Sequence, residues 1–228
     1  GTKRNGNLKV LLEEKNMEKK KLYIPSEDNY FSQPYIDEEG WRDTPVRHYY
    51  VHGGFRGTEK NGTEARFCFY FPEKDNYAGR FFQYVSPAPA DEHECEWLSG
   101  EDDKIRFSLT HGAYFVNSNQ GGFIPGEGER LYKTSAHCAQ FGRKLAGKLY
   151  EYEHRPYGYI FGGSGGSFKT IGCMEMTEGI WDGGVPYVTA NPMAVPNVFG
   201  PRVRVMRITE TPCRYNGTGR QRKYLRRP

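Results

Sequence analysis

Short segments in which apolar and polar residues alternate dominate the first half of the chain. The clearest is residues 65–71 (ARFCFYF), which end at Pro72. A period of two residues is typical of a β-strand, because successive side chains point to opposite faces of a sheet. Other β-branched and aromatic segments predict further strands at residues 46–52, 80–85, 113–116, 157–161 and 185–189.

A helical period appears in the second half. Within residues 129–150, one set of small or apolar residues recurs every three or four positions: Leu131, Ser135, Cys138, Gly142, Leu145 and Leu149. This spacing predicts an amphipathic helix, and residues 168–177 are apolar enough for a second, buried one. Strands that alternate with helices of this length favour parallel pairing with right-handed crossovers. The fold class is therefore α/β.

The periodic part of the chain is expected to form a core at residues 46–200. Residues 1–45 lack a regular period and predict an extended N-terminal lead-in. Residues 201–228 predict a basic, disordered tail. From Arg202 onward the sequence has nine Lys or Arg residues and one acidic residue, so the formal charge of the tail is +8, whereas that of the whole chain is +4. The tail lacks the interleaved aromatic residues of single-strand binders, so we do not expect a nucleic-acid partner.

Composition excludes several other classes. No apolar run reaches the ~18–20 residues of a membrane-spanning helix. The five cysteines form no C-x-x-C pair and no Cys/His cluster at zinc spacing, so we expect neither a metal nor a cofactor. Two glycosylation sequons, Asn61-Gly-Thr63 and Asn216-Gly-Thr218, would fit a secreted protein but leave the compartment open.

The glycine-rich segment 161–170 (FGGSGGSFKT) carries the candidate chemistry. A phosphate-binding loop has a glycine directly before its lysine, and Phe168 stands at that position here. The pattern G-x-S-x-G, in contrast, is complete around Ser164. It lies between a predicted strand and a predicted helix, which is the context of a nucleophile elbow. Ser164 is thus the candidate nucleophile, and the Gly165 N–H a candidate oxyanion donor.

Two segments around this turn resemble the α/β-hydrolase family, and most closely its tannase and feruloyl-esterase branch. They are Tyr159-Ile-Phe-Gly-Gly-Ser-Gly-Gly-Ser-Phe-Lys and Gly179-Ile-Trp-Asp-Gly-Gly-Val-Pro186. The resemblance covers roughly residues 46–200 and implies a mainly parallel α/β-hydrolase-like sheet. It also implies that Asp182 is structural. That branch commonly has a cysteine before the serine, whereas Gly163 occupies this position here.

A second oxyanion donor could come from either of two loops. In α/β-hydrolases the loop after the third strand supplies it, and here that loop offers the N–H groups of Val85 and Ser86. His52-Gly53-Gly54 resembles the H-G-G motif of lipases and offers Gly53 and Gly54. The sequence leaves both loops open.

The base that would activate Ser164 is missing from its expected place. In the α/β-hydrolase order the acid and the histidine follow the serine, but no histidine follows Ser164. The sequence therefore favours a fragment, or one piece of a larger hydrolase, with a sheet that is incomplete at its C-terminal side. A second chain or a missing C-terminal part would then carry Asp and His. The upstream His52 is the other candidate base.

These observations predict an ester hydrolase that acts on a small-molecule ester through acyl transfer to Ser164. A non-catalytic α/β-hydrolase-like binding protein is the alternative. A nucleotide-binding protein that uses residues 163–170 is a weaker one, because of Phe168.

Overall fold

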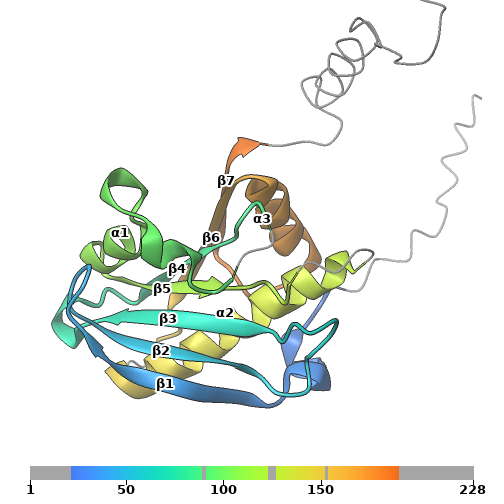
Figure 1. The fold of residues 1–228 in the computed structure, drawn as a ribbon, viewed down its shortest axis with the longest axis horizontal. Helices are drawn as coiled ribbons and strands as arrows, with labels where there is room; N and C mark the ends of the chain where they lie inside the picture. The colour runs from blue at the N-terminus through green and yellow to red at the C-terminus, as the bar shows by residue number, and fades with distance from the viewer. Residues whose placement is uncertain (1–21, 89–90, 123–126, 152–153, 190–228) are drawn as a thin grey trace, which may run out of the picture.

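The computed structural model describes residues 22–88, 91–122, 127–151 and 154–189, which form a seven-stranded sheet in the order β1-β2-β3-β5-β4-β6-β7 (Figure 1). The strands are β1 Pro34–Arg42, β2 His48–Phe55, β3 Arg66–Pro72, β4 Arg80–Tyr84, β5 Ala113–Ser118, β6 Tyr157–Ser164 and β7 Gly183–Thr189. The α-helices are α1 Lys104–Thr110, α2 Gly128–Tyr150 and α3 Gly165–Met176. Short 3-10 helices are η1 Pro25–Glu27, η2 Asn29–Phe31, η3 Lys74–Asn76, η4 Glu94–Trp97 and η5 Gly100–Asp102.

Five strands (β2, β5, β4, β6 and β7) run in one direction, and β1 and β3 run in the other. β5, β4, β6 and β7 pair in parallel, while β3 pairs antiparallel with both β2 and β5, and β1 pairs antiparallel with β2. The parallel half contains the strand–helix–strand units that the sequence predicts. The α/β class is confirmed.

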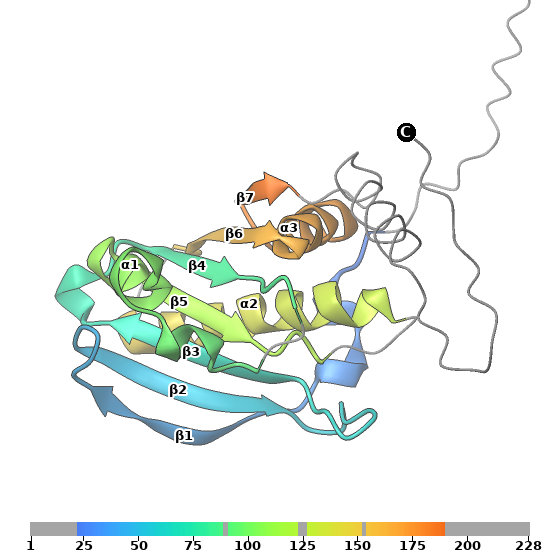
Figure 2. The same cartoon turned by 45° about the horizontal axis from the view of Figure 1, so that its top comes forward.

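The alternation in β3 separates two apolar cores. Phe67, Phe69 and Phe71 belong to the core beneath α2 and α3, whereas Cys68 and Tyr70 belong to the core beneath α1. Figure 2 shows α1 and α2 on opposite faces of the sheet. The molecule therefore has three layers, because each face of the sheet needs a helical cover.

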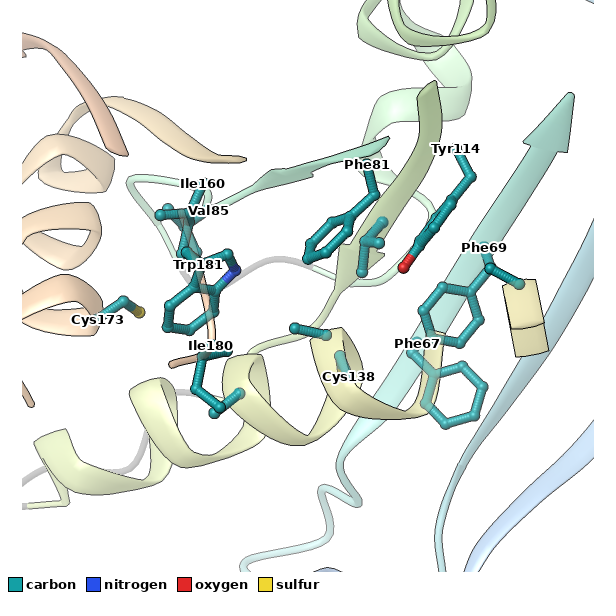
Figure 3. Close-up of a cluster of buried hydrophobic side chains, with 14 of the residues drawn as sticks. Phe67, Phe69, Phe81, Val85, Tyr114, Cys138, Ile160, Cys173, Ile180 and Trp181 are labelled. Carbon is teal, nitrogen blue, oxygen red and sulfur yellow. The ribbon is translucent and has the colours of Figure 1, made fainter. Parts of the chain in front are cut away.

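Helix α2 lies close to the sheet because its contact face is small. Ser135, Cys138 and Gly142 are buried as the period predicts, but the predicted leucines are only partly buried at its flanks. A Cβ on Gly142 would lie 2.8 Å from the Phe69 ring, so a larger side chain would push the helix outward. Figure 3 shows Cys138 facing the aromatic side chains of this core.

Three elements differ from the predicted pattern. Residues 34–42, expected within an extended lead-in, form the edge strand β1, and residues 104–110 form a helix that the sequence period did not predict. Strand β2 continues through Gly53 and Gly54 to Phe55. A Cβ on Gly53 would lie 2.0 Å from the Tyr35 carbonyl oxygen, so the glycine allows β1 to pair closely there.

Both predicted termini, residues 1–21 and the tail 201–228, lie outside the described residues. None of the helices in the described ranges is long and apolar enough to cross a membrane.

Candidate active site

Ser164 occupies a strained turn between β6 and α3. It is the last residue of β6, and α3 begins at Gly165. Its backbone has φ 55° and ψ −122°, a conformation that residues with a side chain rarely adopt, and the residue is exposed. Such backbone strain costs about 1–3 kcal/mol and concentrates at functional sites. The turn thus presents the serine hydroxyl to solvent at the carboxyl end of the parallel strands.

The glycines of the G-x-S-x-G pattern have no space for side chains. A Cβ on Gly162 or Gly166 would lie 2.5 or 2.3 Å from the Val85 carbonyl oxygen. On Gly163 it would lie 2.4 Å from the Tyr187 ring. Real Cβ atoms do not approach other atoms this closely. Glycine is therefore required at Gly162 and Gly166, which meet backbone atoms, whereas a side chain at Gly163 would displace the Tyr187 ring. The pattern in the sequence is therefore a packing requirement of the turn.

The loop after β4 lies directly against this turn. A Cβ on Gly165 would lie 2.8 Å from the Pro87 carbonyl oxygen. Gly165 is the first residue of α3, where backbone N–H groups have no partner within the helix. The Val85 N–H already donates to the Phe161 carbonyl, 2.9 Å away, and is removed as an oxyanion donor. The backbone N–H of Ser86, the next residue, remains the candidate oxyanion donor from this loop.

The competing H-G-G candidates lie elsewhere. Gly53 and Gly54 are inside β2 and pair with both β1 and β3. Three strands separate β2 from β6, which is about 19 Å at the usual strand spacing. The local resemblance to an oxyanion loop was misleading, because sheet pairing occupies this backbone.

His52 is equally remote from Ser164. It also lies on β2, and its side chain contacts the carboxylates of Asp37 (Nδ1 to Oδ1, 2.6 Å) and Glu92 (Nε2 to Oε1, 3.2 Å). These contacts raise its pKa, the hydrogen bond to Glu92 having the largest effect and burial opposing it. The structure thus does not bring the predicted upstream base to the nucleophile.

The other histidines also lie away from the turn. All six histidines of the sequence fall within the described ranges. The hydrogen-bonding partners are Val46 for His48, Cys68 for His93, Phe107 for His111 and Tyr23 for His137. His154 precedes the start of β6 and Ser164 ends it, and the strand between them is about 23 Å long. No histidine of this chain is placed to deprotonate Ser164.

The phosphate-loop alternative fits the geometry poorly. The Lys169 ammonium donates to the Gln120 side-chain oxygen at 2.7 Å, and burial lowers its pKa. The carbonyl oxygens of Val85 and Pro87 face the glycine turn. Carbonyl oxygens repel phosphate, which instead needs converging N–H groups.

Glu94 is an ionisable group near this turn that the sequence did not single out. It lies on η4, and burial raises the pKa of its carboxyl, opposed by Ser86 and by the charges of Lys169 and Lys104. Its Oε1 atom is buried without a hydrogen-bond partner in the described part of the chain. Glu94, Ser86 and Lys169 belong to three separate segments that the fold brings close together. The spacing of residues along the sequence therefore could not indicate this group.

Asp182 lies at the opposite end of β6. It accepts from the Gly158 N–H at 2.7 Å and from the Arg155 guanidinium at 2.8 and 3.0 Å. These bonds, with Arg155 and Arg143 nearby, lower the pKa of its carboxyl against the effect of burial. The structural role implied for Asp182 agrees with this geometry.

Comparison with known proteins gives distant structural likeness. No protein-family model and no curated protein sequence matches the chain. It is similar to tannin acyl hydrolase from Aspergillus niger at 14% identity, covering 68% of this chain and 31% of that one, with a TM-score of 0.44. It is also similar to feruloyl esterase B from Aspergillus oryzae at 14% identity, covering 71% of this chain and 36% of that one, with a TM-score of 0.48. Its identity to Candida antarctica lipase A is 15%, covering 73% of this chain and 46% of that one, with a TM-score of 0.43.

The chain spans less than half the length of each of these three proteins. Its strand order and its strand–turn–helix at Ser164 agree with the α/β-hydrolase-like sheet that the sequence predicts.

Proposed function

We propose that this chain carries the nucleophile of a serine-dependent ester hydrolase, and that Ser164 is this nucleophile. The observation that carries the proposal is the backbone of Ser164, an exposed serine held at positive φ between a parallel strand and a helix. A protein keeps such strain only where the surrounding structure enforces it, and here four tightly packed glycines and the loop after β4 do so.

The chemistry follows from the groups around this hydroxyl. Ser164 Oγ attacks the carbonyl carbon of an ester, a C–O bond forms, and the carbonyl oxygen becomes an oxyanion. The N–H groups of Gly165 and Ser86 hold that oxyanion, and the N-terminal end of the 12-residue helix α3 adds a favourable dipole. The alcohol then leaves, and water releases the acid from the acylated serine.

The proton of Ser164 needs an acceptor from outside this sequence. Since none of the six histidines reaches Ser164, we propose that a second polypeptide, or another part of a longer protein, supplies the histidine and its acid partner. The chain described here would then contribute the nucleophile and the oxyanion donors.

Aromatic side chains support an apolar or aryl ester as substrate. The Tyr187 ring lies against Gly163 and is 41% exposed, and Phe168 in the first turn of α3 is 58% exposed. Both can cover an acyl or alkoxy group bound at Ser164.

Acyl transfer from p-nitrophenyl butyrate, with imidazole added as the base that this chain lacks, tests the proposal, because p-nitrophenolate leaves without the help of an acid. The folded wild-type chain should become acylated on the peptide that contains Ser164. The control variant Ser32→Ala, which lacks a different exposed serine, should be acylated in the same place. The variant Ser164→Ala should show no acylation of this peptide. Acylation that spreads over lysines and spares Ser164 would contradict the nucleophile assignment.

A non-catalytic binding protein is the second candidate, favoured by the absence of a nearby histidine in this chain. It predicts that ester binding survives Ser164→Ala and that no acylated serine forms in the wild type.

A further inference from the structure

A cluster of metal-ligating side chains lies on the α1 face of the sheet, remote from Ser164. His52 on β2 and Cys68 on β3 are direct partners in the antiparallel register, so their side chains stand together on one face. His93, just before η4, completes the group. One ligand atom from each of these three residues lies within 4.8 Å of the other two.

The spacing is close to that of a tetrahedral zinc site. Ligand bonds of about 2.3 Å to sulfur and 2.05 Å to nitrogen place S and N about 3.6 Å apart, and two N or O ligands about 3.3 Å apart. Cys68 Sγ lies 3.7 Å from His93 Nδ1. A fourth group, Glu92 Oε1, lies 3.2 Å from His52 Nε2. The three ligand atoms lie within 4.8 Å of one another, so no pair would have to close by more than about 1.5 Å on binding.

His52 is oriented as a ligand by Asp37. Its Nδ1 atom lies 2.6 Å from Asp37 Oδ1, which fixes the Nδ1–H tautomer and leaves a lone pair on Nε2. That lone pair faces the Glu92 carboxylate. The Arg66 guanidinium lies beside both groups, 3.2 Å from His52 Nε2 and 3.5 Å from Glu92 Oε1, and a metal ion bound between them would displace it.

The surrounding charges leave room for a divalent cation. Three carboxylates (Asp37, Glu92 and Glu96) stand against two guanidinium groups (Arg42 and Arg66), a formal sum of −1. Ionisation of Cys68 makes it −2. A divalent ion would therefore neutralise the cluster.

We propose that this cluster is a Zn²⁺ site, with Cys68 Sγ, His52 Nε2, His93 Nδ1 and the Glu92 carboxylate as ligands. A mixed sulfur, nitrogen and oxygen set is typical of zinc. Cys68 releases its proton to solvent as the Zn–S bond forms. The site is independent of the function proposed for Ser164.

Burial and access suit a site that holds its ion. Cys68 is fully buried and His52 is 8% exposed, while the His93 side chain is 35% exposed and offers a route for the ion. Zinc there would tie β2 and β3 to the segment that carries η4.

Cobalt titration of the untagged full chain, first stripped with a chelator, tests the proposal. We expect one equivalent of Co²⁺ to bind with a thiolate-to-cobalt charge-transfer absorption, one equivalent of Zn²⁺ to displace it, and Zn²⁺ to raise the melting temperature. Asp37→Asn should weaken zinc binding by about 10–100-fold, because Asp37 positions His52.

Ligand variants and matched controls make the test specific. Cys68→Ser and the partly exposed His93→Ala should lose the absorption and the single equivalent of bound zinc. The equally buried Cys95→Ser and the exposed-histidine variant His111→Ala should keep both. A folded wild-type chain that shows no charge-transfer band would overturn the proposal, as would zinc binding that persists in folded His93→Ala.

Discussion

Replacing Ser164 by glycine should stabilise the folded chain while it removes the hydroxyl. The serine has φ 55° and ψ −122° and is exposed, so its side chain adds strain without adding burial. Glycine adopts positive φ at no steric cost. Alanine at the same position keeps the strain and is the matched reference.

The expected gain follows from two opposing contributions. Relief of the backbone strain is worth about 1–3 kcal/mol, and the greater freedom of glycine in the unfolded chain costs about 0.5–1 kcal/mol. The net effect of Ser164→Gly relative to Ser164→Ala is therefore about 1 kcal/mol of added stability. For a chain of 228 residues this corresponds to about 2–4 °C in melting temperature.

Thermal and urea unfolding of the two variants under identical conditions measures this difference. If Ser164→Gly is no more stable than Ser164→Ala, the turn is not strained, and the main support for a nucleophile elbow is lost.

Two further predictions concern packing and pH. Gly166→Ala should destabilise the chain by at least about 2 kcal/mol, because its Cβ would lie 2.3 Å from the Val85 carbonyl oxygen; Gly172→Ala on the same helix meets nothing within 4 Å and should stabilise it by about 0.5–1 kcal/mol. Equal effects in urea unfolding would refute this packing. Burial lowers the pKa of His137 to about 4, whereas the unfolded histidine titrates near 6.5, so the folded state should lose about 2–4 kcal/mol as the pH falls from 6.5 to 4. His137→Phe should flatten the stability profile over that window, and an unchanged slope would show that His137 is not buried in its neutral form.

The elements found from sequence are those whose pattern is local. The alternation in residues 65–71 predicted β3 because each side chain meets one of two cores. The glycines around Ser164 predicted the turn because each lacks space for a Cβ. Such patterns can be recognised in a sequence because they involve residues that are close together along the chain.

The groups that sequence missed depend on register and on long-range pairing. His52-Gly53-Gly54 resembled an oxyanion loop, but pairing with two neighbouring strands makes it part of β2. Cys68 and His93 showed no zinc spacing, since the β2–β3 register and a separate loop bring them to His52. Strand β1 escaped prediction because most of its residues are exposed and lack an apolar period.

Labelling with a fluorophosphonate probe, with and without added imidazole, is the most direct test of Ser164 as a nucleophile. We expect an adduct that maps to Ser164, forms slowly in buffer, forms faster when imidazole supplies the missing base, and is absent from Ser164→Ala. A folded chain that gives no Ser164 adduct under either condition would contradict the assignment of Ser164 as a nucleophile.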